Sequence, residues 1–129
     1  MNLKEVDKPE VKQTVVVYSG RFQPFHAGHY ITYLKLAKKF GKDNVYIGTS
    51  NDTSGPKSPF NFNEKVKIMI TMFGVPSDKI EQVRNPYAPK EILSKFLITL
   101  DLKLNDTKTH ISHIKDGFIF LGIHFIGKN

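Results

Sequence analysis

The stretch Ser19-Gly20-Arg21-Phe22-Gln23-Pro24-Phe25-His26-Ala27-Gly28-His29 separates an apolar run, residues 14–18, from a helical pattern that continues to Phe40. A buried strand, a tight turn that carries glycine, and a helix N-terminus form a corner in this order. Backbone N–H groups and the positive end of the helix dipole converge there on an anion. The sequence therefore predicts a phosphate-binding corner.

Two histidines, an arginine and a glycine give this corner its chemistry. His26 and His29 are three residues apart, so both imidazoles lie on one face of a first helical turn. Arg21 adds a fixed charge and a planar fork that suits phosphate oxygens. Gly28 has no Cβ at the point where a phosphate would approach the backbone most closely. This set can stabilise negative charge on a phosphoryl group in a transition state. The alternative is that the two histidines only cap and pack a helix start.

The residues Gly20–His29, GRFQPFHAGH, resemble the first signature of the HxGH nucleotidyltransferase superfamily. The fuller string is similar to its cytidylyltransferase-like and nicotinamide-mononucleotide adenylyltransferase-like branch and to phage-type relatives. The likeness continues through KSPFNFNEK at residues 57–65 and Asn85-Pro86-Tyr87, and so covers about residues 14–97. It implies an enzyme that transfers an adenylyl or cytidylyl group from ATP or CTP to a phosphorylated small molecule, with release of pyrophosphate. Nicotinamide mononucleotide is the acceptor that this likeness favours.

The same resemblance implies roles for individual residues. His26, His29 and Arg21 would be catalytic. The residues expected to hold the nucleotide and its phosphates are Ser19, Gly20, Phe22, Gln23, Gly28 and Lys57. The residues expected at the acceptor are Asn51, Pro86 and Tyr87. Mg²⁺ would enter with the triphosphate, and no metal site made by the protein is expected.

Composition describes one small domain. The 129 residues are 40% hydrophobic and 24% charged, with room for a single core. No apolar run approaches the length of a membrane span, and residues 1–13, a predicted loose leader, lack the apolar centre of a signal peptide. A cytoplasmic protein is therefore expected. The absence of cysteine excludes disulfides and thiolate metal sites.

The formal net charge of +7 favours polyanionic partners, which a triphosphate satisfies as well as nucleic acid does. The lysines are dispersed along the chain, without a dense tract interleaved with aromatic residues. A solvated basic surface is thus at least as good an interpretation, and a nucleic-acid partner is not expected.

Apolar periodicity predicts an alternation of strands and helices over residues 14–97. Strands are expected at residues 14–18, 44–50 and 80–83, and helices up to Phe40, from near Asn61, and briefly at residues 90–96. This order predicts an α/β fold, a Rossmann-like doubly wound parallel sheet that is incomplete. We expect the first strand to be central and flanked by the other two.

Residues 98–129 have a different pattern and are predicted to be a β-rich tail. Ile98, Leu100, Leu102 and Leu104 alternate with polar residues, as in a half-buried strand. Turns are expected at residues 105–106 and 116–117, and a further strand at the apolar run 118–126. We expect the tail to extend the sheet or pack on its edge, to supply no residue to the phosphate corner, and to bury its apolar run there or in a homo-oligomer.

Two features of the tail leave other functions open. Residues 102–109 and 117–122 resemble the end of the palm in group II intron-type reverse transcriptases, although the paired aspartates of a polymerase have no counterpart. Nucleotidyltransferases of the HxGH type usually carry a second signature beyond the fourth strand, and residues 96–129 hold no convincing counterpart. A catalytically incomplete nucleotide-binding remnant and a nucleic-acid-binding fragment are therefore the alternatives.

Overall fold

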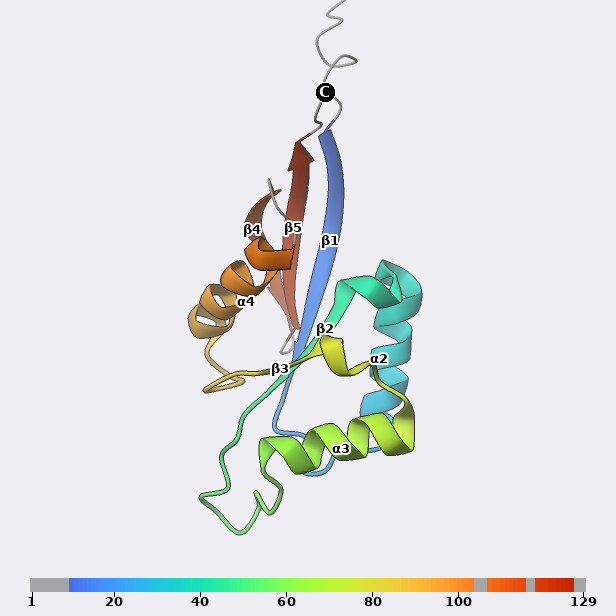
Figure 1. Cartoon of the computed structure of the whole chain (residues 1–129), viewed down its shortest axis with the longest axis vertical. Helices are drawn as coiled ribbons and strands as arrows, with labels where there is room; N and C mark the ends of the chain where they lie inside the picture. Colours follow the sequence, from blue (N-terminus) through green and yellow to red (C-terminus); the bar gives the residue numbers. More distant parts are fainter. Residues whose placement is uncertain (1–9, 104–106, 116–117, 127–129) are drawn as a thin grey trace, which may run out of the picture.

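The computed structural model describes residues 10–103, 107–115 and 118–126, with side chains described over residues 14–99 and 118–121. The strands are β1 (Glu10–Ser19), β2 (Val45–Thr49), β3 (Ile80–Gln82), β4 (Thr107–Lys115) and β5 (Phe118–Ile126). The helices are α2 (Ala27–Phe40), α3 (Phe62–Phe73) and α4 (Pro89–Lys103), with short 3₁₀ turns at residues 42–44 and 77–79. Figure 1 shows these elements along the chain.

The described strands form one sheet in the order β3-β2-β1-β5-β4. β1 pairs in parallel with β2, which pairs in parallel with β3, while β5 runs antiparallel to both β1 and β4. The Rossmann-like α/β fold and the central place of β1 are confirmed. The expected position of β3 beside β1 is wrong, because β3 adds to the far side of β2 and β5 takes the other side of β1. The sheet is therefore mixed.

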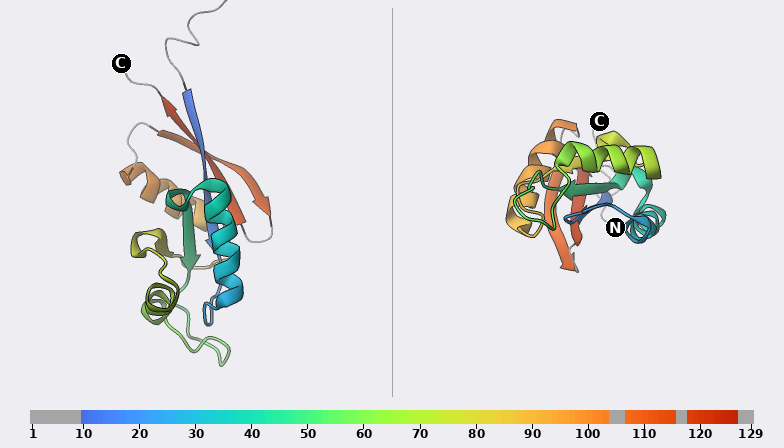
Figure 2. Two further views of the ribbon diagram at one scale, coloured as in Figure 1. Left: turned by 90° about the vertical axis from the view of Figure 1, so that its right-hand side faces the viewer. Right: turned by 90° about the horizontal axis from the view of Figure 1, so that it is seen from below.

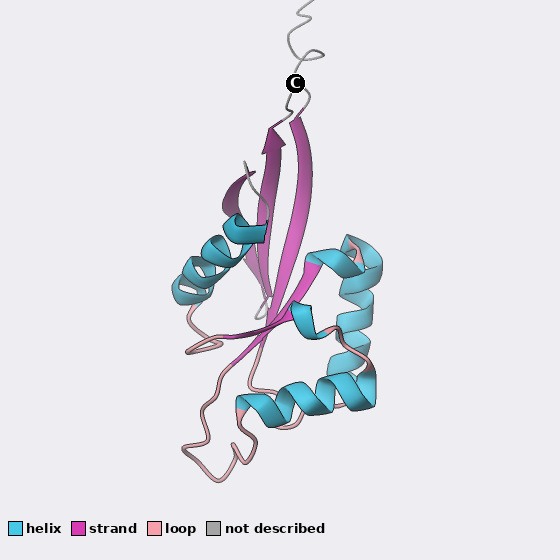
Figure 3. Ribbon diagram, in the orientation of Figure 1, coloured by secondary structure: helices cyan, strands magenta, loops and turns pink. Residues whose placement is uncertain are grey.

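The helices cover the two faces of this sheet (Figures 1 and 3). Side chains from α2 and α3 join one buried cluster with Val45, Ile47 and Ile80, whereas α4 supplies Ile92 and Phe96 to a second cluster on the other face. Because crossovers are right-handed, the direction in which the chain moves from strand to strand decides on which face of the sheet the connecting helix lies. β1, β2 and β3 follow one another in one direction, so α2 and α3 share a face. The chain then reverses direction, and α4 lies opposite.

The expected end of the first helix at Phe40 and the expected start of the second near Asn61 are confirmed. α2 begins after His26 and ends at Gly41, whose φ of 93° suits only glycine well. α3 begins after Asn61, which exchanges hydrogen bonds with Glu64 in a capping box, and ends at Gly74 in the left-handed conformation. The two N-caps, His26 and Asn61, fix the points at which the loops before α2 and α3 end.

The tail departs from its prediction at one element. Residues 98–103 were expected as a strand but continue α4. Their alternating apolar residues also stand four apart, and residues 90–104 contain neither glycine nor proline to end a helix, so helical propagation from Pro89 prevails. The strand at residues 118–126 is confirmed, and it pairs with both neighbours (Figure 2). The turns expected at residues 105–106 and 116–117 lie outside the described residues.

The N-terminal prediction is corrected in part. Residues 10–13 belong to β1 and pair with residues 123–126 of β5, so they are not part of a loose leader. Residues 1–9 lie outside the described residues. Over the part of the chain that the structure describes, no helix combines the length and apolarity needed to cross a bilayer.

Candidate functional site

Two adjoining pockets lie at the carboxyl ends of the parallel strands, where open α/β sheets bind ligands. The first, which we call the histidine pocket, has a volume of about 570 Å³ and is lined by the β1–α2 loop, both histidines, Lys57 and Tyr87. The second, the Arg84 pocket, has a volume of about 490 Å³ and lies toward β3 and α4. Arg21, Gln23 and Tyr87 line both, so the pockets share a wall.

His26 and His29 cap α2 reciprocally. The Nδ1 of His26 accepts hydrogen bonds from the backbone N–H groups of Gly28 and His29, at 3.0 and 3.4 Å. The Nδ1 of His29 accepts from the backbone N–H of His26 at 3.1 Å. The two rings stack with centroids 3.7 Å apart. The prediction that both imidazoles share a face is confirmed, and His26 is the N-cap residue itself.

This cap selects one tautomer of each neutral imidazole. A ring nitrogen that accepts a hydrogen bond carries no proton, so the proton resides on Nε2 in both rings. Each Nε2–H is then the donor available to a ligand in the histidine pocket, which both rings line. Burial, and next the neighbouring His26, lower the pKa of His29 below its ordinary value. Both effects favour the neutral form that this arrangement requires.

The turn before α2 is held by aromatic packing. The Phe22 ring is buried and contacts Tyr18, Phe25 and His29 at centroid distances of 5.1, 5.3 and 4.9 Å. Its backbone has a φ of 49°, a left-handed conformation that is costly for a phenylalanine and that the packed ring enforces. Phe22, which was expected to contact the nucleotide, lines the histidine pocket, and its buried ring supports the turn that forms the pocket wall.

Two glycines make room for the rings of this turn. A Cβ at Gly20 would lie 3.1 Å from the Phe22 ring, and a Cβ at Gly28 would lie 3.0 Å from Cε1 of His26. Sequence reasoning attributed Gly28 to the approach of a phosphate. The structure gives a nearer reason, since the His26 ring occupies the space that a side chain at residue 28 would need. Ser19 is buried at the end of β1 and lines the same pocket.

Arg21 and Gln23 tie the turn to the loop that follows β2. Nη2 of Arg21 donates to the carbonyl of Lys57 at 2.8 Å and to Oγ of Ser58 at 2.7 Å. The Gln23 side chain donates to the carbonyl of Phe60 and accepts from its N–H, at 2.8 and 2.9 Å. The long loop at residues 50–61 is thereby fixed as a wall of the site (Figure 3).

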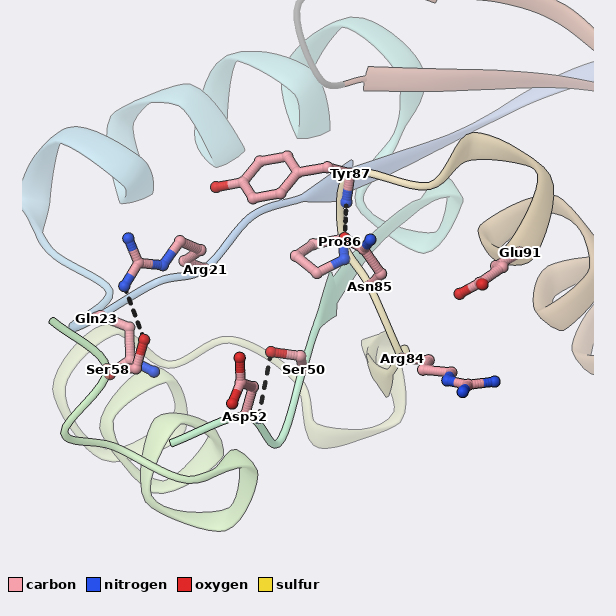
Figure 4. A pocket seen from close by; sticks show the side chains of 10 residues that line it. All are labelled: Arg21, Gln23, Ser50, Asp52, Ser58, Arg84, Asn85, Pro86, Tyr87 and Glu91. Carbon is pink, nitrogen blue, oxygen red and sulfur yellow. Dashed lines mark hydrogen bonds between the residues drawn. The ribbon is translucent and has the colours of Figure 1, made fainter. Parts of the chain in front are cut away.

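The three residues expected at an acceptor separate in the structure. Pro86 and Tyr87 line the Arg84 pocket, whereas the Asn51 side chain accepts from the backbone N–H of Phe62 at the start of α3 and lines neither pocket. Figure 4 shows the Tyr87 ring extending along the Arg84 pocket toward Arg21. The Tyr87 side chain is 66% exposed.

Six residues that line the Arg84 pocket were given no individual role from the sequence: Ser50, Asp52, Ser58, Arg84, Asn85 and Glu91. In Figure 4 they surround the cavity from the end of β2, the loop that follows it, the end of β3 and the start of α4. The rule that ligands bind at the carboxyl ends of strands applies to the loop at residues 50–60, and at the end of β3 it also points to Arg84. Hydrogen bonds from Ser54 hold the pKa of the Asp52 carboxyl below its ordinary value, so it is ionised at neutral pH.

A buried lysine lies beneath the shared wall. The Lys65 side chain is 0% exposed, and its Nζ donates to Oγ1 of Thr49 at 2.9 Å and to the carbonyl of Arg21 at 3.1 Å. Burial, and next the charge of Arg21, lower the pKa of Lys65. From the sequence, Lys65 was expected to belong to a dispersed, solvated basic surface, and its burial corrects this expectation.

The fold and this corner agree with the comparison against protein families. The model of the family described as cytidylyltransferase-like matches residues 17–116, and the chain belongs to this family. The match begins in β1 and spans both pockets.

Among curated proteins, the chain is similar to nicotinamide-nucleotide adenylyltransferases of archaea. It is 38% identical over 52 residues to that of Methanolobus tindarius, which covers 40% of this chain and 30% of the relative. It is 39% identical over 54 residues to that of Halobacterium salinarum, covering 42% and 30%. The protein of Methanospirillum hungatei is 36% identical over 55 residues, covering 43% and 31%. The chain thus spans about a third of these relatives' length. No solved structure matches it significantly.

Proposed function

We propose that this chain binds a nucleoside triphosphate in the histidine pocket and transfers its nucleotidyl group, adenylyl in the first instance, to a phosphorylated small molecule in the Arg84 pocket. One observation carries this proposal. The reciprocal histidine cap leaves two Nε2–H donors in a pocket that Arg21 also lines, and this pocket shares a wall with a second one. Cytidylyl transfer from CTP is the alternative chemistry at the same site.

The two pockets suit two phosphorylated groups that must meet. The histidine pocket offers His26, His29 and Lys57 to a triphosphate near the positive end of the α2 dipole, while the backbone N–H groups of His26, Gly28 and His29 are already bonded to the two imidazoles. The Arg84 pocket offers a second arginine to the phosphate of the acceptor and the face of Tyr87 to its ring. Arg21 lines both, so its guanidinium lies where the two ligands would approach each other. Nicotinamide mononucleotide is the first acceptor to test, because the similar proteins are named nicotinamide-nucleotide adenylyltransferases.

The reaction needs positioning and charge stabilisation and no covalent intermediate with the protein. An oxygen of the acceptor phosphate attacks the α-phosphorus in line with the bond to the β-phosphate oxygen. That bond breaks, and pyrophosphate leaves with its electron pair. His26 and His29 donate Nε2–H hydrogen bonds to the phosphate oxygens on which charge increases, and Arg21 adds a positive charge. Phe22 and Phe25 hold the His29 ring in place.

Mg²⁺ would accompany the triphosphate. The Arg84 pocket contains the carboxylates of Asp52 and Glu91 and the hydroxyls of Ser50 and Ser58, which are oxygen ligands of the kind that Mg²⁺ prefers. Among the described residues, no three His, Asp or Glu side chains gather closely enough to hold a metal ion, so phosphates and waters would supply most of the Mg²⁺ ligands and the protein at most one or two carboxylates. When bound, it supplies charge neutralisation to the triphosphate.

A second candidate is nucleotide binding without transfer. Among the residues whose side chains the structure describes, those that line the histidine pocket come from Tyr18 to Tyr87. The later cation that the HxGH resemblance implies for the outer phosphates is not found among these described side chains. A nucleotide-binding remnant would keep ATP affinity and lack turnover.

Pyrophosphate release by the purified chain separates the two candidates. ATP and CTP are each offered with nicotinamide mononucleotide, other phosphorylated acceptors, or no acceptor. Acceptor-dependent pyrophosphate release that His29→Ala abolishes supports the proposed transfer, with the exposed Lys35→Ala as the matched control. ATP binding without release supports the remnant. Absence of both ATP and CTP binding would overturn both proposals.

A further inference from the structure

A lysine in the buried face of α3 is the residue from which a further role can be inferred. Lys65 is 0% exposed, whereas Lys67, two residues later on the same helix, is exposed. Burying an ammonium is expensive, and an apolar side chain of similar volume is often neutral or stabilising in its place. Packing alone therefore does not account for a lysine at residue 65.

The contacts of Lys65 join three elements at the shared wall of the two pockets. Its Nζ donates to the carbonyl of Arg21, just after β1, and to Oγ1 of Thr49, the last residue of β2. The Thr49 hydroxyl in turn donates to the same Arg21 carbonyl at 3.1 Å. The triangle is closed by three hydrogen bonds and links α3, β2 and the β1–α2 loop.

The carbonyl that Lys65 holds belongs to the residue whose guanidinium lines both pockets. The Arg21 side chain reaches outward to Lys57 and Ser58, while its backbone is fixed from below by Lys65 and Thr49. Arg21 also precedes Phe22, whose left-handed backbone needs a rigid setting. Without the ammonium, the Arg21 carbonyl would keep the Thr49 hydroxyl as its only partner within this triangle.

We propose that Lys65 is a positioning residue of the nucleotide site, which fixes the Arg21 main chain against the end of β2 and so aims the Arg21 guanidinium at the phosphates. The role rests on the proposed function, since it acts through a residue assigned to triphosphate binding. Lys65 lines neither pocket and would not contact either ligand directly.

A double-mutant cycle on ATP affinity tests this role. Lys65→Met should weaken ATP binding about tenfold, the scale of losing a hydrogen bond to a charged group. In an Arg21→Ala background the same change should weaken ATP binding by less than about twofold, because the guanidinium that Lys65 positions is no longer present. Equal effects in both backgrounds would overturn the proposal. Lys67→Met is the matched control and should leave ATP affinity unchanged.

Two further variants separate positioning from general stability. Lys65→Arg retains donors for both oxygens and should recover ATP affinity to within about threefold of wild type. Thr49→Val removes one side of the triangle and should give a smaller loss than Lys65→Met. Thermal unfolding should show Lys65→Met to be as stable as wild type or more so. A loss of ATP affinity that follows a loss of thermal stability across the series would overturn the positioning role.

A measurement without ligand makes failure of this inference distinguishable from failure of the proposed function. The amide nitrogen of Phe22 is bonded to the Arg21 carbonyl carbon, so its NMR shift reports hydrogen bonds to that carbonyl. Lys65→Met should move this signal, and Lys67→Met should not. If the wild-type chain binds neither ATP nor CTP, the proposed function fails, and the NMR shifts still test the contact. An unmoved Phe22 signal would overturn the inference even where ATP binds.

Discussion

The two buried clusters on either face of the sheet differ in what they support. The cluster under α2 and α3 contains Phe22 and Phe25, which belong to the site loop itself. The cluster under α4 is built from β1, β2, β5, α4 and Val83, and it contains no residue of that loop. One cluster therefore supports the histidine pocket directly through residues of the β1–α2 loop, whereas the other contains no residue of that loop.

This difference shows how the site is kept rigid although it consists of loops. The aromatic rings of Phe22 and Phe25 enter the cluster under α2 and α3, and the His29 ring packs on both. Dense packing leaves these rings little freedom to move, and their contacts with His29 restrict the histidine cap in turn. The cluster under α4 stabilises the sheet without this connection.

Removing one large ring from each cluster is the strongest test of this difference. Phe25 and Phe96 are both fully buried, at 2% and 0% exposure. Phe25→Ala and Phe96→Ala should each lower the free energy of unfolding by about 3–5 kcal/mol, measured by urea denaturation. Under conditions where both variants remain folded, only Phe25→Ala should weaken ATP binding. Equal ATP affinities in the two variants would contradict the comparison.

His29→Ala carries the next largest expected effect. It removes one donor to the transition state, and nucleotidyl transfer should fall by about 10²-fold or more in a pyrophosphate-release assay. His29 is half-buried and its ring packs on Phe22 and Phe25, so some stability should be lost too. A circular-dichroism melt separates that loss from catalysis. Undiminished turnover would refute the assigned role.

Gly28→Ala should have a smaller effect. Alanine normally stabilises a helix relative to glycine, but a Cβ here would lie 3.0 Å from Cε1 of His26. The His26 ring must shift and weaken its cap, so we expect a net loss of about 1 kcal/mol in the free energy of unfolding. Gly55→Ala is the control, since a Cβ there meets no atom within 4 Å. A stabilising Gly28→Ala would indicate that the cap tolerates the shift.

The smallest expected effect is a pH dependence of stability. The pKa of His29 in the folded chain lies below its ordinary value of 6.5, so the folded state binds fewer protons than the unfolded state between these two values. The contribution of His29 to stability is therefore complete above about pH 6.5 and is lost as pH falls through the folded pKa. Urea denaturation at stepwise lower pH should show the decline. His29→Asn should reduce its slope, and an unchanged slope would contradict this origin.

The parallel half of the sheet and the strand–turn–helix corner at residues 19–29 were predictable because local signals agree there. The apolar run at residues 14–18, the glycine-bearing turn and the caps at His26, Asn61 and Gly74 each specify one structure over a few residues. Whether β3 would pair with β1 or with the far side of β2 was not predictable. The handedness rule fixes the face of a crossover helix but not the edge that the next strand joins.

The rest of the site could not be predicted because it depends on distant contacts. Ser58 and Phe60 become part of the site only through hydrogen bonds from Arg21 and Gln23. The burial of Lys65 follows from packing of α3 on the sheet, which periodicity alone does not reveal. The helical state of residues 98–103 was missed because a spacing of two over a short run contains the spacing of four.

The place of β5 has a consequence for how the chain folds as it is synthesised. Val17 in the central strand pairs with Ile119, so the chain must be made beyond residue 119 before one side of β1 finds its partner. Until then β1 presents an open hydrogen-bonding edge and part of an uncovered apolar face. Such non-local pairing is slow and exposes the nascent chain to aggregation. On the ribosome, β1 should therefore gain its second neighbour only after β5 has left the exit tunnel.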